Sequence, residues 1–110
     1  MENHFTNVRD AKSFEELVSR SQEKPIVIFK HSTTCPISAA AYERMTHFDG
    51  EVALVDVQSA REVSKEIEKK TGVPHESPQV LVLHNGKVIW NASHWKVTAD
   101  AVADAIGKNS

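Results

Sequence analysis

A strand-like run that ends in a turn carrying the single cysteine constrains this chain most. Residues 26–29 are apolar, β-branched or aromatic, and have no polar break, which is typical of a strand buried on both faces of an α/β sheet. Hydroxylated residues 32–34 follow, Cys35 then stands where a helix N-cap is expected, and Pro36 suits the first helical position. The sequence therefore predicts a strand–turn–helix unit with Cys35 at the open amide end of the helix.

A thiol in this position is a candidate nucleophile. The unpaired N–H groups and the dipole of the first helical turn favour the thiolate. Ser38 stands one turn beyond Cys35 on the same side of the helix, in a C-x-x-S motif, where its hydroxyl can donate to the thiolate or serve backbone groups instead. Because there is one cysteine, a mixed disulfide on Cys35 must be resolved by an external thiol. A lone cysteine is also often an inert buried hydrophobe.

Length and composition indicate one ordinary globular domain, residues 1–110. The net charge of −2 gives no reason to expect nucleic acid or an anionic membrane as a partner. A single cysteine excludes an internal disulfide framework, and there is no signal-peptide pattern or membrane-length apolar run. We therefore expect a protein of the reducing cytoplasm.

Hydrophobic periodicity and turn signals predict the order β-α-β-α-β-α-β-β-α, in which the first strand is the least certain. Strands are expected near residues 4–8, 26–29, 51–57, 79–83 and 87–90. Helices are expected to open at capping boxes Ser13–Glu16 and Ser59–Glu62, at Pro36, and at Thr98, with Gly72 and Gly107 ending two of them. The spacing indicates right-handed βαβ units, and Asn85-Gly86 predicts a type I′ hairpin.

The order and two local motifs resemble the thioredoxin fold, with a β-α-β-α-β-β-α core, a central mixed sheet and helices on both faces. The approach to Cys35, residues 32–36, looks like that of glutaredoxins, and Ser77-Pro78 stands where the superfamily has its cis-proline. The stretch KPIVIFKHSTTCPIS, with SHW at residues 93–95, looks like the monothiol bacilliredoxin family.

Two departures from related families concern charge near the nucleophile. Phe29 stands where thioredoxins have a buried acid, and Ser32 where glutaredoxins commonly have a lysine. Lys30 and His31 are candidates to replace the missing positive charge, although either can point away from Cys35.

The resemblance implies a thiol–disulfide oxidoreductase that needs no metal and no tightly bound cofactor. Cys35 would take bacillithiol from a bacillithiolated client protein as a mixed disulfide, and a second bacillithiol, the thiol co-substrate, would release it. The partners are thus client proteins and a low-molecular-weight thiol, with no nucleic acid and no membrane. The expected catalytic residues are Cys35 and Ser38, and the expected substrate-binding residues are Thr34, Pro36, Ser77, Pro78 and His94.

The place of His94 follows from the hairpin register. If the Asn85-Gly86 loop sets the pairing, opposed residue numbers sum to 171, so Val82 faces Ile89 and Ser77 faces His94. His94 would then lie at the rim of the Cys35 site and hold the thiolate or a carboxylate of bacillithiol, with Trp95 as an apolar wall. A solvated loop histidine is the alternative.

Two other functions stay open at this point. One is an iron–sulfur cluster carrier of the monothiol glutaredoxin type, which the bulky Pro36 and Ile37 disfavour. The other is a non-catalytic thioredoxin-like binding module. A zinc site built from His31, Cys35 and His75 is disfavoured because these residues lack a recognised ligand spacing.

Overall fold

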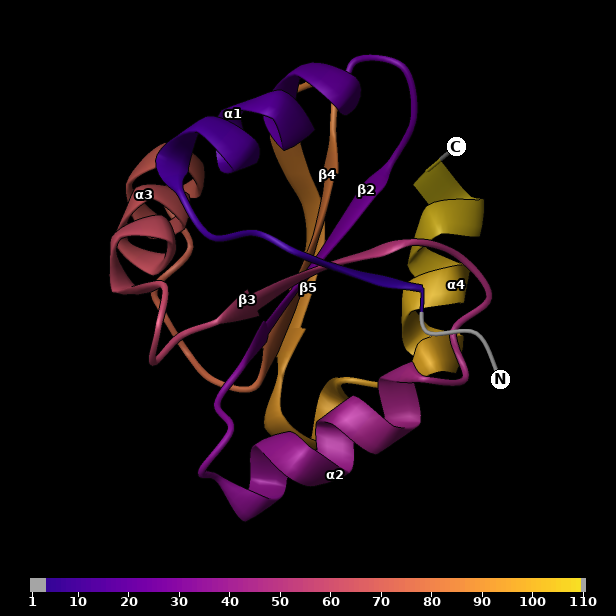
Figure 1. Cartoon of the computed structure of the whole chain (residues 1–110). Helices are drawn as coiled ribbons and strands as arrows, with labels where there is room; N and C mark the ends of the chain where they lie inside the picture. The colour runs from indigo at the N-terminus through magenta and orange to yellow at the C-terminus, as the bar shows by residue number, and fades with distance from the viewer. Residues whose placement is uncertain (1–3, 110) are drawn as a thin grey trace.

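A computed structural model describes residues 4–109 (Figure 1). Five strands occupy β1 (Phe5–Asn7), β2 (Ile26–His31), β3 (Val52–Asp56), β4 (Gln79–His84) and β5 (Lys87–Ser93). The helices are α1 (Ala11–Arg20), α2 (Pro36–Met45), α3 (Arg61–Thr71), the short 3-10 helix η1 (His94–Lys96) and α4 (Ala99–Asn109). The expected element order, including the short first strand, is confirmed.

The five strands form one mixed sheet in the order β1-β3-β2-β4-β5. β2 lies at its centre, parallel to β3 and antiparallel to β4, and β1 runs parallel to β3 at one edge. The strand before Cys35 is therefore central, and residues 26–29 are buried on both faces of the sheet, as their unbroken apolar run predicts.

Helices cover both faces of this sheet (Figure 1), with α1 and α3 on one face and α2 and α4 on the other. Alternate residues of β2 point to opposite faces, so Ile26 and Ile28 belong to the core under α1 and α3, whereas Val27 and Phe29 belong to the core under α2 and α4. The thioredoxin-like α/β architecture is confirmed.

Both predicted capping boxes are wrong. α1 begins one turn earlier than Ser13, because Asp10 is the N-cap and its carboxylate accepts the Ser13 N–H at 2.8 Å. α3 begins at Arg61 without a side-chain cap, so the Ser59–Glu62 pair is not used.

Of the predictions for the other helix ends, two are confirmed and one is wrong. Gly72 ends α3 in the left-handed conformation as predicted, and Thr98 caps α4 by accepting the Ala101 N–H. Gly107 does not end α4, which continues to Asn109.

The hairpin between β4 and β5 has the predicted turn but a shifted register. Asn85 and Gly86 both have positive φ, and Leu83 faces Val88 as expected. A bulge then moves the pairing by one residue, so Val82 faces Trp90 instead of Ile89.

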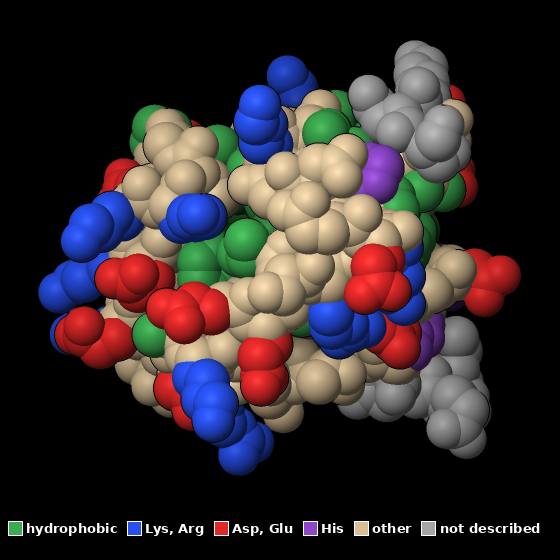
Figure 2. Space-filling view, turned by 90° about the horizontal axis from the view of Figure 1, so that it is seen from above, with side chains coloured by type: hydrophobic (Ala, Val, Ile, Leu, Met, Phe, Trp, Pro, Cys, Tyr) green, Lys and Arg blue, Asp and Glu red, His purple; other side chains and the backbone are tan. Residues whose placement is uncertain are grey.

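The face of the molecule seen from above carries no patch of a single charge sign. In the view from above (Figure 2), acidic and basic side chains lie beside one another rather than in a patch of one sign. Within residues 4–109 no helix is long and apolar enough to cross a membrane.

Candidate active site

Cys35 sits where the sequence places it, at the N-cap of α2 with Pro36 in the first turn. Its thiol is free and half-buried, and its own N–H closes a turn with the Ser32 carbonyl at 3.4 Å. The Ala39 N–H is the first to bond back into the helix, to the Cys35 carbonyl at 3.0 Å. The earlier amides of the first turn, those of Ile37 and Ser38, have no intrahelical acceptor and are available to an anion at Cys35.

Ser38 is fully buried below the Cys35 turn. Its hydroxyl oxygen accepts the Ser32 N–H at 2.9 Å, which ties the turn to the helix. A hydroxyl that accepts one bond still has a proton to donate, and Cys35 lies one turn away on the same side. The Ser38 hydroxyl therefore bonds to the backbone, and this bond leaves it able to donate to a Cys35 thiolate as well.

The turn before Cys35 is held from outside by Gln58, which the sequence analysis did not single out. The Gln58 carbonyl oxygen accepts both the backbone N–H and the hydroxyl of Thr33, and its amide nitrogen donates to the Thr34 hydroxyl at 2.9 Å. Because β2 and β3 are parallel neighbours, the residues that follow each strand meet at one edge of the sheet. That parallel pairing was the available signal for Gln58.

His31 lies under α2, but it is poorly suited to supply a positive charge. Its ring packs at 5.0 Å from that of Tyr42 and 5.7 Å from that of Phe29, and its Nδ1 is buried without a hydrogen-bond partner. Burial lowers the pKa of His31, although the Asp56 carboxylate opposes this. The imidazole is therefore neutral at neutral pH.

Ser77 and Pro78 form the expected cis peptide bond at the start of β4. The Pro78 carbonyl accepts the His94 N–H at 3.0 Å, so His94 lies beside this bond even though the bulge shifts the register. The His94 ring turns toward Glu76, whose carboxylate is 3.7 Å from Nδ1, and both side chains are about half-exposed. The structure thus brings His94 to the cis-proline and leaves its ring in a solvent-exposed contact with the Glu76 carboxylate.

η1 is fastened to α2 by an arginine that the sequence analysis also missed. Arg44 donates to the carbonyls of His94 at 3.1 Å and Val97 at 2.8 Å. The next residue in η1, Trp95, is 69% exposed and is the one large exposed hydrophobic side chain of the described residues.

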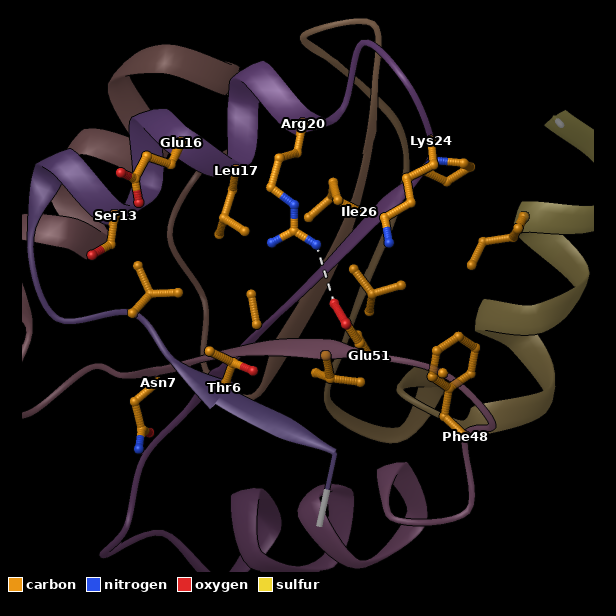
Figure 3. A pocket seen from close by; sticks show the side chains of 17 residues that line it. Thr6, Asn7, Ser13, Glu16, Leu17, Arg20, Lys24, Ile26, Phe48 and Glu51 are labelled. Atoms are coloured by element: carbon orange, nitrogen blue, oxygen red, sulfur yellow. Dashed lines mark hydrogen bonds and ion pairs between the residues drawn. The ribbon is translucent and has the colours of Figure 1, made fainter. Parts of the chain in front are cut away.

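Two further features lie apart from this site. A cavity of about 400 Å³ opens near the start of β2, the end opposite Cys35, where Arg20 and Glu51 form an ion pair at 3.1 Å (Figure 3). None of the expected site residues lines this cavity. Among residues 4–109, no group of three or more His, Cys, Asp or Glu side chains is arranged to hold a metal ion.

Comparison with known proteins gives a family and a fold. The family model described as monothiol bacilliredoxin BrxC matches residues 6–102. A solved protein with a thioredoxin fold is 35% identical, with a TM-score of 0.85 and 93% of each chain covered.

More distant solved structures share the same architecture. Mitochondrial thioredoxin 3 from Saccharomyces cerevisiae is 18% identical, with a TM-score of 0.71 over 94% of each chain. The Schistosoma mansoni thioredoxin pre-protein is 17% identical, with a TM-score of 0.69 over 96% of this chain and 98% of that one. At these identities the likeness shows the fold alone.

Proposed function

Since the chain belongs to the monothiol bacilliredoxin family, we propose that it removes bacillithiol from S-bacillithiolated proteins by thiol–disulfide exchange at Cys35. The family and the fold support a thiol redox role. The observation that carries the finer proposal is a single, half-buried free thiol at a helix start, with buried Ser38 where a dithiol enzyme would have its second cysteine.

The proposed reaction has two exchange steps. The Cys35 thiolate attacks the bacillithiol sulfur of the client's mixed disulfide, a new S–S bond forms on Cys35, and the client leaves as a thiolate that takes up a proton. A second bacillithiol thiolate then attacks the same bacillithiol sulfur, releases Cys35 and leaves as bacillithiol disulfide. In the net reaction the client thiol is reduced, one free bacillithiol is oxidised as it joins the transferred bacillithiol in the disulfide, and no metal or bound cofactor takes part.

The remaining site residues have supporting roles in this proposal. Thr34 and Pro36 flank the thiol, and the Ser77 backbone, presented by Pro78, pairs with an extended client segment as an added strand does. His94 holds a carboxylate of bacillithiol, for which it must exchange its solvated pairing with Glu76, and Trp95 offers an apolar wall. We propose the reducing cytoplasm as the compartment.

The test is transfer of bacillithiol between two proteins, followed by intact mass. We expect the Cys35 protein to gain one bacillithiol as a bacillithiolated client loses one, and free bacillithiol to reverse the gain. Cys35→Ala is the control for the thiol, and Ser38→Cys is the matched variant that adds a resolving thiol. If neither mass changes with the native chain, the proposal fails. A purified protein with the visible absorption of an iron–sulfur cluster would instead favour a cluster carrier.

A further inference from the structure

A lysine is buried inside this sheet without a partner. Lys30, the fifth residue of β2, has no exposed surface, and its Nζ makes no hydrogen bond among the described residues. Burying an amine without a hydrogen-bond partner costs free energy, and lysines are rarely fully buried unless they are paired. The proposed exchange reaction makes no use of Lys30.

The position of Lys30 in β2 shows on which face of the sheet its side chain lies. Side chains alternate along β2, so Lys30 shares the face of Ile28 under α1 and α3, opposite to Phe29 and His31. Its neighbours across the strands are uncharged: Val55 in β3 and Gln79 in β4.

The charges that act on Lys30 come from α3 and from the loop of residues 73–78, which we call the proline loop. The carboxylates of Glu68 in α3 and Glu76 in the proline loop favour its ammonium form, and the His75 imidazole is the remaining titratable neighbour. Among residues 4–109 neither acid forms an ion pair or a hydrogen bond with Nζ, so the attraction is a longer-range one.

The side chains of Glu68 and Gln79 hold the backbone of the proline loop. Glu68 accepts the His75 N–H at 3.2 Å. Gln79, directly opposite Lys30, accepts the Glu76 N–H at 3.4 Å and donates to the Pro74 carbonyl at 3.1 Å.

A second buried polar atom without a partner belongs to the cis Ser77-Pro78 unit. The Ser77 hydroxyl oxygen is, like Lys30 Nζ, buried without a partner in the described part of the chain. On the solvent side of the proline loop, the Glu76 carboxylate lies 3.7 Å from His94 Nδ1. Lys30 pairs in the sheet with Gln79, the residue after Pro78, so its charge is placed next to the segment that presents Ser77 and Pro78 to the site.

We propose that the Lys30 ammonium is a positioning group for the proline loop, attracting the Glu68 and Glu76 carboxylates from beneath the loop so that Ser77 and Pro78 stay in place for exchange at Cys35. This rests on the proposed function for its catalytic consequence but not for its structural one. Burial lowers the pKa of Lys30 to about 8, despite the two acids, so the charge is present at neutral pH and is lost in mildly alkaline solution.

The structural arm of the test compares native protein with Lys30→Met, which keeps the length of the side chain and removes its charge. NMR measurement of solvent exchange at the His75 and Glu76 amides is expected to give roughly five-fold faster exchange in the variant at pH 7. The ratio is expected to fall toward one at pH 9.5, where native Lys30 is neutral. Glu68→Gln and Glu76→Gln change exposed side chains, fold without a buried substitution, and are expected to speed exchange at the same amides.

The catalytic arm measures bacillithiol removal from a client between pH 6.5 and 9.5, alongside alkylation of Cys35 by iodoacetamide. Lys30→Met is expected to raise KM for the client several-fold at pH 7 and to leave alkylation unchanged, because a small reagent does not need the proline loop. Lys24→Met, an exposed lysine, is the matched control.

The outcomes separate the two proposals. Native amide exchange rates in Lys30→Met and both glutamine variants overturn the positioning role whatever the activity. Faster amide exchange in these variants, together with no bacillithiol transfer by the native chain, supports the positioning role and overturns the proposed function. A several-fold loss of alkylation in Lys30→Met would place the effect on the thiol itself and overturn a role in the proline loop.

Discussion

Replacing Lys30 by methionine is expected to stabilise the protein at neutral pH and to remove a pH dependence of unfolding. The reason is that a buried ammonium costs free energy that a buried thioether does not. In the folded chain the pKa of Lys30 falls from 10.5 to about 8, because burial outweighs the attraction of Glu68 and Glu76. The side chain of Lys30 has no exposed surface in the folded chain.

The magnitude follows from linkage. Each pKa unit corresponds to about 1.4 kcal/mol, so the shift of Lys30 lowers the free energy of unfolding by about 3 kcal/mol wherever both states are protonated. Between about pH 8 and 10.5 the unfolded chain binds more protons at this site than the folded chain. The contribution of Lys30 to stability therefore rises with pH through that window, and the penalty is largest below pH 8.

The assay is urea unfolding of native and Lys30→Met protein from pH 6 to 10.5, followed by tryptophan fluorescence. The informative quantity is the difference between their free energies of unfolding, because other titrating groups cancel. We expect Lys30→Met to be more stable by about 3 kcal/mol at pH 7, with the gap closing above pH 8. The exposed Lys24→Met is expected to stay within about 0.5 kcal/mol of native. A gap that is constant across the pH range would refute the reasoning.

Three further substitutions address the surroundings of Cys35. Ser38→Ala leaves the half-buried Ser32 N–H without its acceptor and is expected to lower the free energy of unfolding by about 1 kcal/mol and to slow exchange; urea unfolding and client transfer measure the two effects. Gln58→Ala releases the turn before Cys35 at a cost of about 1 kcal/mol, and faster amide exchange at Thr33 is the measurement. His94→Asn is expected to slow exchange while stability stays within about 0.5 kcal/mol, since its contact with Glu76 is exposed to solvent; an unchanged rate would remove His94 from the site.

Local signals were sufficient for the part of the fold that holds the nucleophile. The run of apolar residues 26–29 specified a central strand, and Cys35 followed by Pro36 specified the start of α2, because each signal is made within a few residues. The Asn85-Gly86 turn was equally local, since both positions need a positive φ.

Local sequence signals did not predict which of two possible N-caps is used or where a strand forms a bulge. Asp10 and Ser13 are both good N-caps one turn apart, and Asp10 is the one that the structure uses. The bulge in β5 moved the partner of Val82 by one residue, which a rule based on turn geometry cannot foresee. His94 nevertheless reached Pro78, because a shift of one residue moves a strand end by only a few ångströms.

The face of Lys30 was predictable but was not predicted. Side chains alternate along a strand, so Lys30 points to the face opposite to that of Phe29 and His31. The two basic residues, Lys30 and His31, therefore cannot lie on the same face of the sheet. The predicted βαβ unit already made β2 and β3 parallel neighbours, so Gln58 could have been found from it, whereas Glu68 required the packing of α3 against the proline loop.

The two basic residues that precede Cys35 divide between the two faces of β2, and neither is a simple substitute for a cation beside the thiol. His31 points under α2 but is driven toward its neutral form by burial, and Lys30 carries its charge on the opposite face. Stabilisation of a Cys35 thiolate then depends on the open amides of the first turn of α2, together with Ser38. On this view the thiol and the surface that receives the client are controlled separately: α2 acts on the sulfur, and Lys30 acts on the proline loop beside it.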